Sequence, residues 1–163
     1  MSVLIDDGAK IIADESASIE IYGSLFAGNQ TVFTYIYDLP NTQGLLRDAP
    51  HPVGGGDNWW RGLTVEGGGF VELRNADILY ARNFAVGESI KVKQGGTLNI
   101  FGGSITRKLT VTPVLSFDSA NGQLSACRIN GGFIGIKITG EIDGIIIDNC
   151  LFGSGVRTPI LYP

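Results

Sequence analysis

Short runs in which aliphatic and polar residues alternate recur along the whole chain. Residues 19–21 read Ile-Glu-Ile, residues 71–73 read Val-Glu-Leu, and residues 134–138 read Ile-Gly-Ile-Lys-Ile. Alternation with a period of two is typical of a β-strand that buries one face. Apolar stripes with the 3.6-residue period of a helix are absent from the sequence. The pattern therefore predicts an all-β protein.

These runs return at a regular interval. If Leu73, Leu98, Leu124 and Ile146 are equivalent positions, the intervals between them are 25, 26 and 22 residues. A parallel β-solenoid has such an interval, because each coil holds two or three short strands and the next coil stacks about 4.8 Å above it. An antiparallel sandwich or barrel is the alternative, and two Asn-Gly pairs would suit its hairpin turns. We favour the solenoid, since the interval is longer than one hairpin step.

The interval predicts a parallel β-helix of about six to seven coils of 22–26 residues. We expect its corners at Asn75, Asn149, Gly102–Gly103 and Gly131–Gly132, because Asn and Gly tolerate the left-handed backbone. Residues 1–163 form a single domain in this interpretation. Residues 38–58 lack a strand pattern and form an inserted loop, and residues 153–163 form an irregular tail or cap.

Charge and cysteine content narrow the possible partners. The 163 residues carry 16 acidic and 12 basic side chains, a formal net charge of −4, which disfavours nucleic acid and anionic membranes. No apolar run approaches the roughly 18 residues of a membrane span. Cys127 and Cys150 lie one coil apart, so we expect them to stack in adjacent rungs, as free thiols rather than as a disulfide.

Candidate catalytic groups do not form a set that matches a known chemistry. The pair Asp6–Asp7 is best explained by a solvated turn. A calcium-dependent lyase would need about three carboxylates and a base. The polar residues of 137–143 alternate with apolar ones on one outward face, and we expect Arg128 one coil away from them. We interpret them as a solvated surface of mixed charge. The sequence therefore predicts no catalytic residue, no metal site and no cofactor.

The loop and its end supply the candidate ligand-binding residues. His51 is the only histidine and lies between two prolines, as in a surface loop. We expect Trp60 to pack against the solenoid wall, and Trp59 to face solvent beside Tyr80 or Arg61, where an exposed ring could stack on a sugar. The other interpretation is that both tryptophans only pin the loop to the coil.

Several segments resemble a known group of proteins. Residues 3–11, 18–27 and 32–34, the Trp-Trp-Arg-Gly-Leu element within 57–63, and residues 71–81 are similar to the first coils of right-handed parallel β-helix repeat proteins of the pectin-lyase-like superfamily. The resemblance implies that the β-helix is right-handed. Many such proteins resemble non-catalytic components of bacterial surfaces or phage particles, so function must be argued from a site.

The ends of a solenoid expose strand edges that need a cover. We expect a neighbouring copy of the chain, or further coils of a longer parent chain, to cover them. The sequence therefore predicts a structural or adhesive module of a surface fibre or phage particle, located extracellularly, at the cell surface or on a virion, which could contact carbohydrate. A polysaccharide lyase or glycoside hydrolase is the alternative, and an ice-binding surface ranks last because no threonine row repeats at coil spacing.

Overall fold

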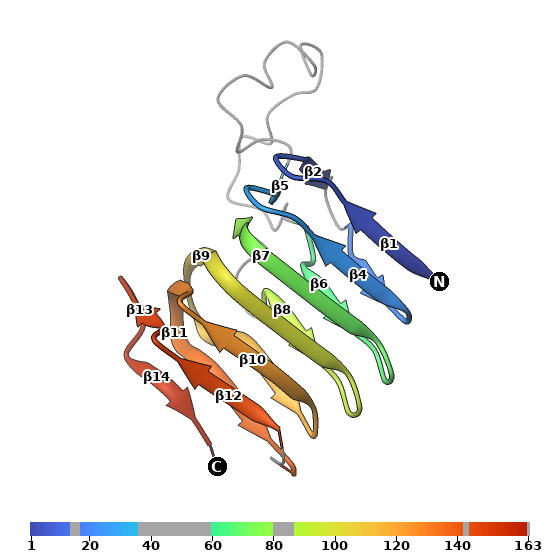
Figure 1. Cartoon of the computed structure of the whole chain (residues 1–163). Helices are drawn as coiled ribbons and strands as arrows, with labels where there is room; N and C mark the ends of the chain where they lie inside the picture. The colour runs from blue at the N-terminus through green and yellow to red at the C-terminus, as the bar shows by residue number, and fades with distance from the viewer. Residues whose placement is uncertain (14–16, 36–59, 80–86, 142–143, 163) are drawn as a thin grey trace.

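The chain forms an all-β parallel solenoid (Figure 1). The computed structural model describes residues 1–13, 17–35, 60–79, 87–141 and 144–162. Every strand pairing within them is parallel, and they contain no helix. The solenoid makes about five turns, slightly fewer than the six to seven coils that the sequence predicted. The two ends of the chain lie at opposite ends of the stack of strands.

Three faces make up each coil, and each face is a parallel stack of strands. The first face contains β1 (Ser2–Ile5), β4 (Ser24–Ala27), the starts of β7 (Phe70–Leu79) and β9 (Thr97–Asp118), β10 (Asn121–Ser125) and β12 (Ile145–Asp148). The second face contains β2 (Lys10–Ala13), β5 (Val32–Tyr35), the later parts of β7 and β9, the start of β11 (Arg128–Thr139) and β13 (Leu151–Phe152). The third face contains β3 (Ile19–Ile21), β6 (Leu63–Val65), β8 (Ile90–Val92), the ends of β9 and β11, and β14 (Thr158–Leu161).

Aliphatic side chains from equivalent positions fill the interior. On the second face, Ile78, Ile105 and Ile129 pair in successive coils, and each is at most 1% exposed. Each rung thus places an apolar side chain directly above the one below it. Burial of these rows stabilises the stack, at roughly 25 cal/mol for each Å² of apolar surface.

The expected equivalence of the leucines was wrong in detail. Leu73 pairs with Ile100, which pairs with Leu124, which pairs with Ile147. Leu98 therefore lies two positions before the expected one, in the row of Val71. Ile146 lies one position before Ile147, which occupies the row of Leu73, and its side chain points outward and is 56% exposed. A one-residue shift exchanges the two sides of a strand, so corner length decides which aliphatic residue is buried.

The corners between the first and second faces are tight. Asn75 and Asn149 adopt positive φ angles of 44° and 51°, and Gly102 and Gly103 adopt 77° and 80°. These values confirm the corners predicted at these positions. The Asn75 side-chain amide also donates a hydrogen bond of 2.8 Å to the Asn29 side-chain oxygen of the preceding coil, which ties successive corners together.

The connections between the second and third faces vary in length along the sequence. Residues 36–59 and 80–86 belong to such connections, so the predicted loop 38–58 lies outside the described residues. In β9 and β11 the chain instead passes from the second face to the third within one continuous strand.

The passage within β9 and β11 contains a bulge. The stretch of β9 between Thr106 and Pro113 is longer than the part of β11 that it faces, and the register shifts twice there. The predicted corner Gly131–Gly132 lies at this place, with a φ of 99° at Gly131. The corner therefore joins the second and third faces, rather than the first and second.

The tail 153–163, expected to be irregular or to form a cap, contains a strand. Thr158–Leu161 forms β14, which pairs with β11 on the third face. Ile160 pairs with Ile136 and so continues its aliphatic row by one rung. This pairing explains why the segment extends the solenoid.

Candidate functional site

Trp60 and Arg61 are the two predicted ligand-contact residues that the structure describes. The Trp60 ring is fully buried, and its indole N–H donates a hydrogen bond of 3.0 Å to the Leu79 carbonyl oxygen, in the next coil. Trp60 packs against the solenoid as expected, but it presents no ring face to a ligand because no part of it is exposed. Arg61 is exposed, and its backbone N–H donates to the Ala17 carbonyl at 2.6 Å.

His51, Trp59 and Tyr80 lie outside the described residues. In chain order, His51 and Trp59 belong to the connection between β5 and β6, and Tyr80 follows the last residue of β7. The hydrogen bond from the Trp60 indole to the Leu79 carbonyl therefore links the residue after Trp59 to the residue before Tyr80. The proposed sugar contact of these three side chains stays a prediction.

The outward side of the first face carries a group of aromatic rings that the sequence analysis did not single out. The buried residues of this face include Leu25, Val71, Leu73, Ile100 and Leu124, so their neighbours along the strands point away from the core. In successive coils these neighbours form rows across β4, β7, β9 and β10. We call them the first-face surface, which comprises Phe26, Phe70, Glu72, Arg74, Asn99, Phe101 and Gln123.

The rings on this surface contact each other and a cation. Phe26 and Phe70 lie with ring centroids 5.5 Å apart at an interplanar angle of 43°, and Phe26 remains 38% exposed. The Arg74 guanidinium carbon lies 5.4 Å from the centroid of the Phe101 ring, within the range of a cation–π contact. Aromatic surface is therefore present in three neighbouring coils, beside the guanidinium group of Arg74.

Polar groups lie between the rings. An Arg74 guanidinium nitrogen forms an ion pair of 2.7 Å with Glu72, which balances the local charge. The Asn99 side-chain oxygen accepts a hydrogen bond of 3.1 Å from the Gln123 backbone N–H, so the Asn99 amide group is held in one orientation. Rings with hydrogen-bonding side chains between them, on rigid strands, can bind a flat molecule that has both apolar and hydroxyl-bearing sides.

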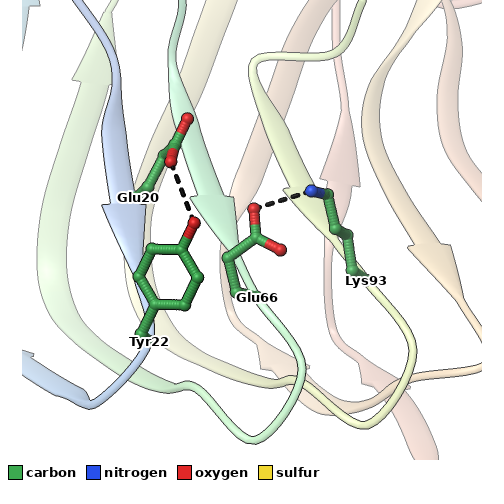
Figure 2. A network of polar contacts seen from close by, with 4 residues as sticks. All are labelled: Glu20, Tyr22, Glu66 and Lys93. Atoms are coloured by element: carbon green, nitrogen blue, oxygen red, sulfur yellow. Dashed lines mark hydrogen bonds and ion pairs between the residues drawn. The ribbon is translucent and has the colours of Figure 1, made fainter.

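A second polar cluster lies where the third face meets the first (Figure 2). The Tyr22 hydroxyl donates a hydrogen bond of 3.3 Å to a Glu20 carboxylate oxygen, and Lys93 Nζ lies 2.6 Å from a Glu66 carboxylate oxygen. Tyr22, Glu66 and Lys93 each follow a paired strand position of β3, β6 or β8, so they occupy successive rungs of one row. The cluster thus draws its side chains from three coils.

The electrostatics of this cluster favour protonated groups. The negative charge of Glu20 is the main cause that raises the pKa of Tyr22. The hydrogen bond to Glu66 is the main cause that raises the pKa of Lys93. Proton abstraction from a sugar carbon needs a base whose pKa is lowered towards neutrality. Both shifts run the other way, so this arrangement suits a structural ion pair.

The described polar residues of 137–143 do not converge on a common point with Arg128. Lys137 and Thr139 lie on the third face, whereas Arg128 starts β11 on the second face. The Thr139 hydroxyl donates to the Phe117 carbonyl at 3.3 Å, and Asp143 lies outside the described residues. Within the described ranges, no three His, Cys, Asp or Glu side chains are placed to hold a metal ion.

The two cysteines lie in adjacent rungs, as the one-coil spacing predicted. Cys127 Sγ and Cys150 Sγ are 3.2 Å apart, and both thiols are free. Burial is the main cause that raises the pKa of Cys127, and its hydrogen bond with Cys150 adds to the shift. A raised thiol pKa disfavours the nucleophilic thiolate, so the pair packs as small apolar groups.

No protein-family model, no curated protein and no solved structure matches this chain. The fold class is therefore established by the structure itself. The structure also contains no helix, in the residues that it describes, that is long and apolar enough to cross a membrane.

Proposed function

We propose that this protein is a non-catalytic, adhesive β-solenoid module that contacts an extended carbohydrate chain through the first-face surface. The observation that carries the proposal is the presence of Phe26, Phe70 and Phe101 on one outward face in three successive coils, interleaved with hydrogen-bonding side chains. An extracellular fibre, a cell surface or a virion is the setting in which such a module would act.

The rigidity of the surface supports binding of a repeating ligand. Its side chains are carried by strands whose spacing is fixed at about 4.8 Å, and sites on strands are held more precisely than sites on loops. A chain polymer can therefore cross several coils and contact a ring in each. The Glu72–Arg74 ion pair leaves little net charge beside Phe101, which favours a neutral sugar over a strongly acidic one.

The alternative, a polysaccharide lyase or hydrolase, receives less support. The polar cluster of Glu20, Tyr22, Glu66 and Lys93 brings carboxylates, a phenol and an amine together (Figure 2). The pKa values of Tyr22 and Lys93 in this cluster are raised. Such groups keep their protons near neutral pH. The first-face surface offers Glu72, but Arg74 neutralises it at 2.7 Å.

A glycan array with the wild type and Phe101→Ala tests the proposal. Phe133→Ala is the matched control, because Phe133 also lies under an arginine, with Arg157 5.3 Å from its ring centroid, but it is outside the first-face surface. Loss of one stacking contact costs about 1.4 kcal/mol, or tenfold in affinity. We expect that loss for Phe101→Ala only.

Two results would contradict the proposal. Equal binding by all three proteins would show that the first-face surface is not the contact, and Trp59→Ala would then test the loop prediction. Release of reducing or unsaturated sugars from acidic polysaccharides by the wild type would show that the alternative, an enzyme, is correct.

A further inference from the structure

The two end rungs of the solenoid have strands that are paired on one side only, among the residues that the structure describes. At one end, β1, β2 and β3 pair with β4, β5 and β6. At the other end, β12 pairs with β10, and β13 and β14 pair with β11. Each end therefore offers three parallel edges, one per face, with the same strand polarity.

Most of the exposed large apolar side chains in the described part of the chain belong to these end rungs. Val3 pairs with the buried Leu25, and Ile160 pairs with the buried Ile136, so both occupy inward rows. Val3 is nevertheless 39% exposed and Ile160 is 44% exposed. They are exposed because, among the described residues, each is covered by a rung on one side only. Other exposed apolar side chains of the end rungs are Met1, Leu4, Ile12, Ile146, Leu151 and Tyr162.

The inward rows of the two end rungs match in register on all three faces. The row that starts with Val3 ends with Ile145, and the row that starts with Ile11 ends with Phe152. The row that starts with Ile19 ends with Ile160. A second copy placed one rung beyond the last coil would therefore continue the apolar rows of every face.

An outward row also has apolar ends. The row that starts with Leu4 passes through Glu72, Asn99 and Gln123 and ends with Ile146. Leu4 and Ile146 are exposed in the single chain. They would become neighbours across the contact between two copies and cover each other.

The first rung contains a hollow that such a copy would meet. It has a volume of about 200 Å³ and is lined by Met1, Val3, Glu20, Ile21, Tyr22, Gly23 and Ser24. A cavity of about 150 Å³ is enough to admit a benzene ring. Leu161 pairs with Lys137 and so belongs to the row of Glu20. Tyr162 is the next residue after Leu161, just as Ile21 is the next residue after Glu20. Tyr162 therefore belongs to the row of Ile21. In the continued register, the Tyr162 side chain is therefore placed to meet the hollow.

We propose that the 163-residue chain associates head to tail with copies of itself, so that the edges of β12, β13 and β14 pair with β1, β2 and β3 of the next copy. The proposal rests on the fibre part of the proposed function and is independent of carbohydrate binding. Backbone hydrogen bonds, the continued apolar rows and the filling of the hollow stabilise the contact. A head-to-tail contact of this kind does not close, so it produces a filament.

One pair of charges opposes the contact and provides a test of the register. Ile5 of the first rung and Ile147 of the last rung belong to the same row. Asp6 follows Ile5 and Asp148 follows Ile147, so these two acidic residues also occupy equivalent positions. Both side chains are exposed, so the two like charges would lie on neighbouring strands and weaken the contact. Association should therefore strengthen with added salt. We expect Asp148→Asn to tighten it about threefold to fivefold.

Sedimentation equilibrium of the 163-residue chain over a range of concentrations measures the association. We expect the average mass to rise above 17.3 kDa with concentration for the wild type. Val3→Lys and Ile160→Lys should each remain monomeric, because each places a charge in the contact. Val111→Lys is the matched control, since Val111 is 75% exposed on the bulge of β9, away from both ends. It should associate like the wild type.

A mixture of the two blocked variants distinguishes the proposed geometry from others. Val3→Lys keeps an intact last rung and Ile160→Lys keeps an intact first rung, so the mixture should form dimers and nothing larger. Dimer formation also shows that both variants are folded.

Three outcomes would overturn the proposal. The wild type could remain monomeric at every concentration, one blocked variant could dimerise alone through two like ends, or Asp148→Asn could have no more effect than Asp118→Asn. Asp118 is exposed in the middle of the stack. Because the glycan array uses a different face, failure here leaves the carbohydrate proposal standing.

Discussion

Gly122 interrupts an inward row of aliphatic residues. The repeat pattern and the packing in the structure predict opposite effects of Gly122→Ala on stability. The row contains Val71 and Leu98 before Gly122 and Ile145 after it. The repeat alone predicts that a side chain at Gly122 would fill a gap and stabilise the protein. In the structure the space is already occupied, because the fully buried Phe117 ring reaches it from the third face.

The structure therefore predicts that Gly122→Ala destabilises the protein. The new Cβ would come closest to the backbone carbonyl oxygen of Leu98, and it would also lie 2.8 Å from Phe117 Cε1 and 3.1 Å from Cζ. Carbon atoms pack at about 3.5–4.0 Å, so the ring would have to retreat by about 1 Å. Overpacking of this kind costs about 1–3 kcal/mol. Replacing a strand glycine by alanine stabilises the fold by only about 0.5–1 kcal/mol, so the free energy of unfolding should fall by a net amount of about 1 kcal/mol.

Urea denaturation followed by far-ultraviolet circular dichroism measures this loss as a lower midpoint at constant slope. A double-mutant cycle with Phe117→Leu assigns the cause, because a smaller side chain at 117 should reduce the cost of the alanine. A midpoint that stays the same or rises in Gly122→Ala would refute the packing argument. An equal loss in both backgrounds would show that the Phe117 ring is not responsible.

Three single contacts yield further predictions. Trp60→Phe should lower the free energy of unfolding by about 1–2 kcal/mol in urea titrations, because the Leu79 carbonyl loses its indole donor. Asn75→Ala should be less stable than Asn75→Gly by about 1–2 kcal/mol in the same assay, since only glycine accepts the φ of 44° without a Cβ penalty. Lys93 should titrate with a pKa above its ordinary value of 10.5 in a carbon-13 NMR experiment, and Glu66→Gln should return it towards that value. Because the folded-state pKa is raised, the ion pair stabilises the fold fully below pH 10.5, and its contribution is lost as the pH rises through the folded-state pKa.

The sequence was sufficient to predict the solenoid but not its register. Alternation and the one-coil return define parallel coils, and the short polar corner residues Asn75 and Asn149 lie where expected. The position of Leu98 depended on how many residues each corner consumes, which composition does not determine. Hydrogen bonds between side chains of adjacent coils span from 21 residues, for Asp118–Thr139, to 46 residues, for Asn29–Asn75, so a fixed interval misassigns individual positions.

The candidate site was harder to predict for the same reason. The sequence drew attention to Trp59 and His51, which are rare residues in an unusual segment. Phe26, Phe70 and Phe101 are unremarkable in sequence and lie in three different coils. Their common face appears only when the register is known, because the intervals between them are unequal. The one available signal was that each phenylalanine adjoins a buried aliphatic residue, namely Leu25, Val71 or Ile100, which marks an outward strand position.

The unequal corners also explain why the first-face surface is continuous across the coils. A Cβ at Gly103 would meet the backbone of Ala76, so the corner between the first and second faces has no room for added side chains. The longer connections instead join the second face to the third, where β9 bulges between Thr106 and Pro113. Segments that vary in length thus do not interrupt the first face. Its rungs keep their even spacing, and under our proposal a polymer would use that spacing to meet a ring in each of three successive coils.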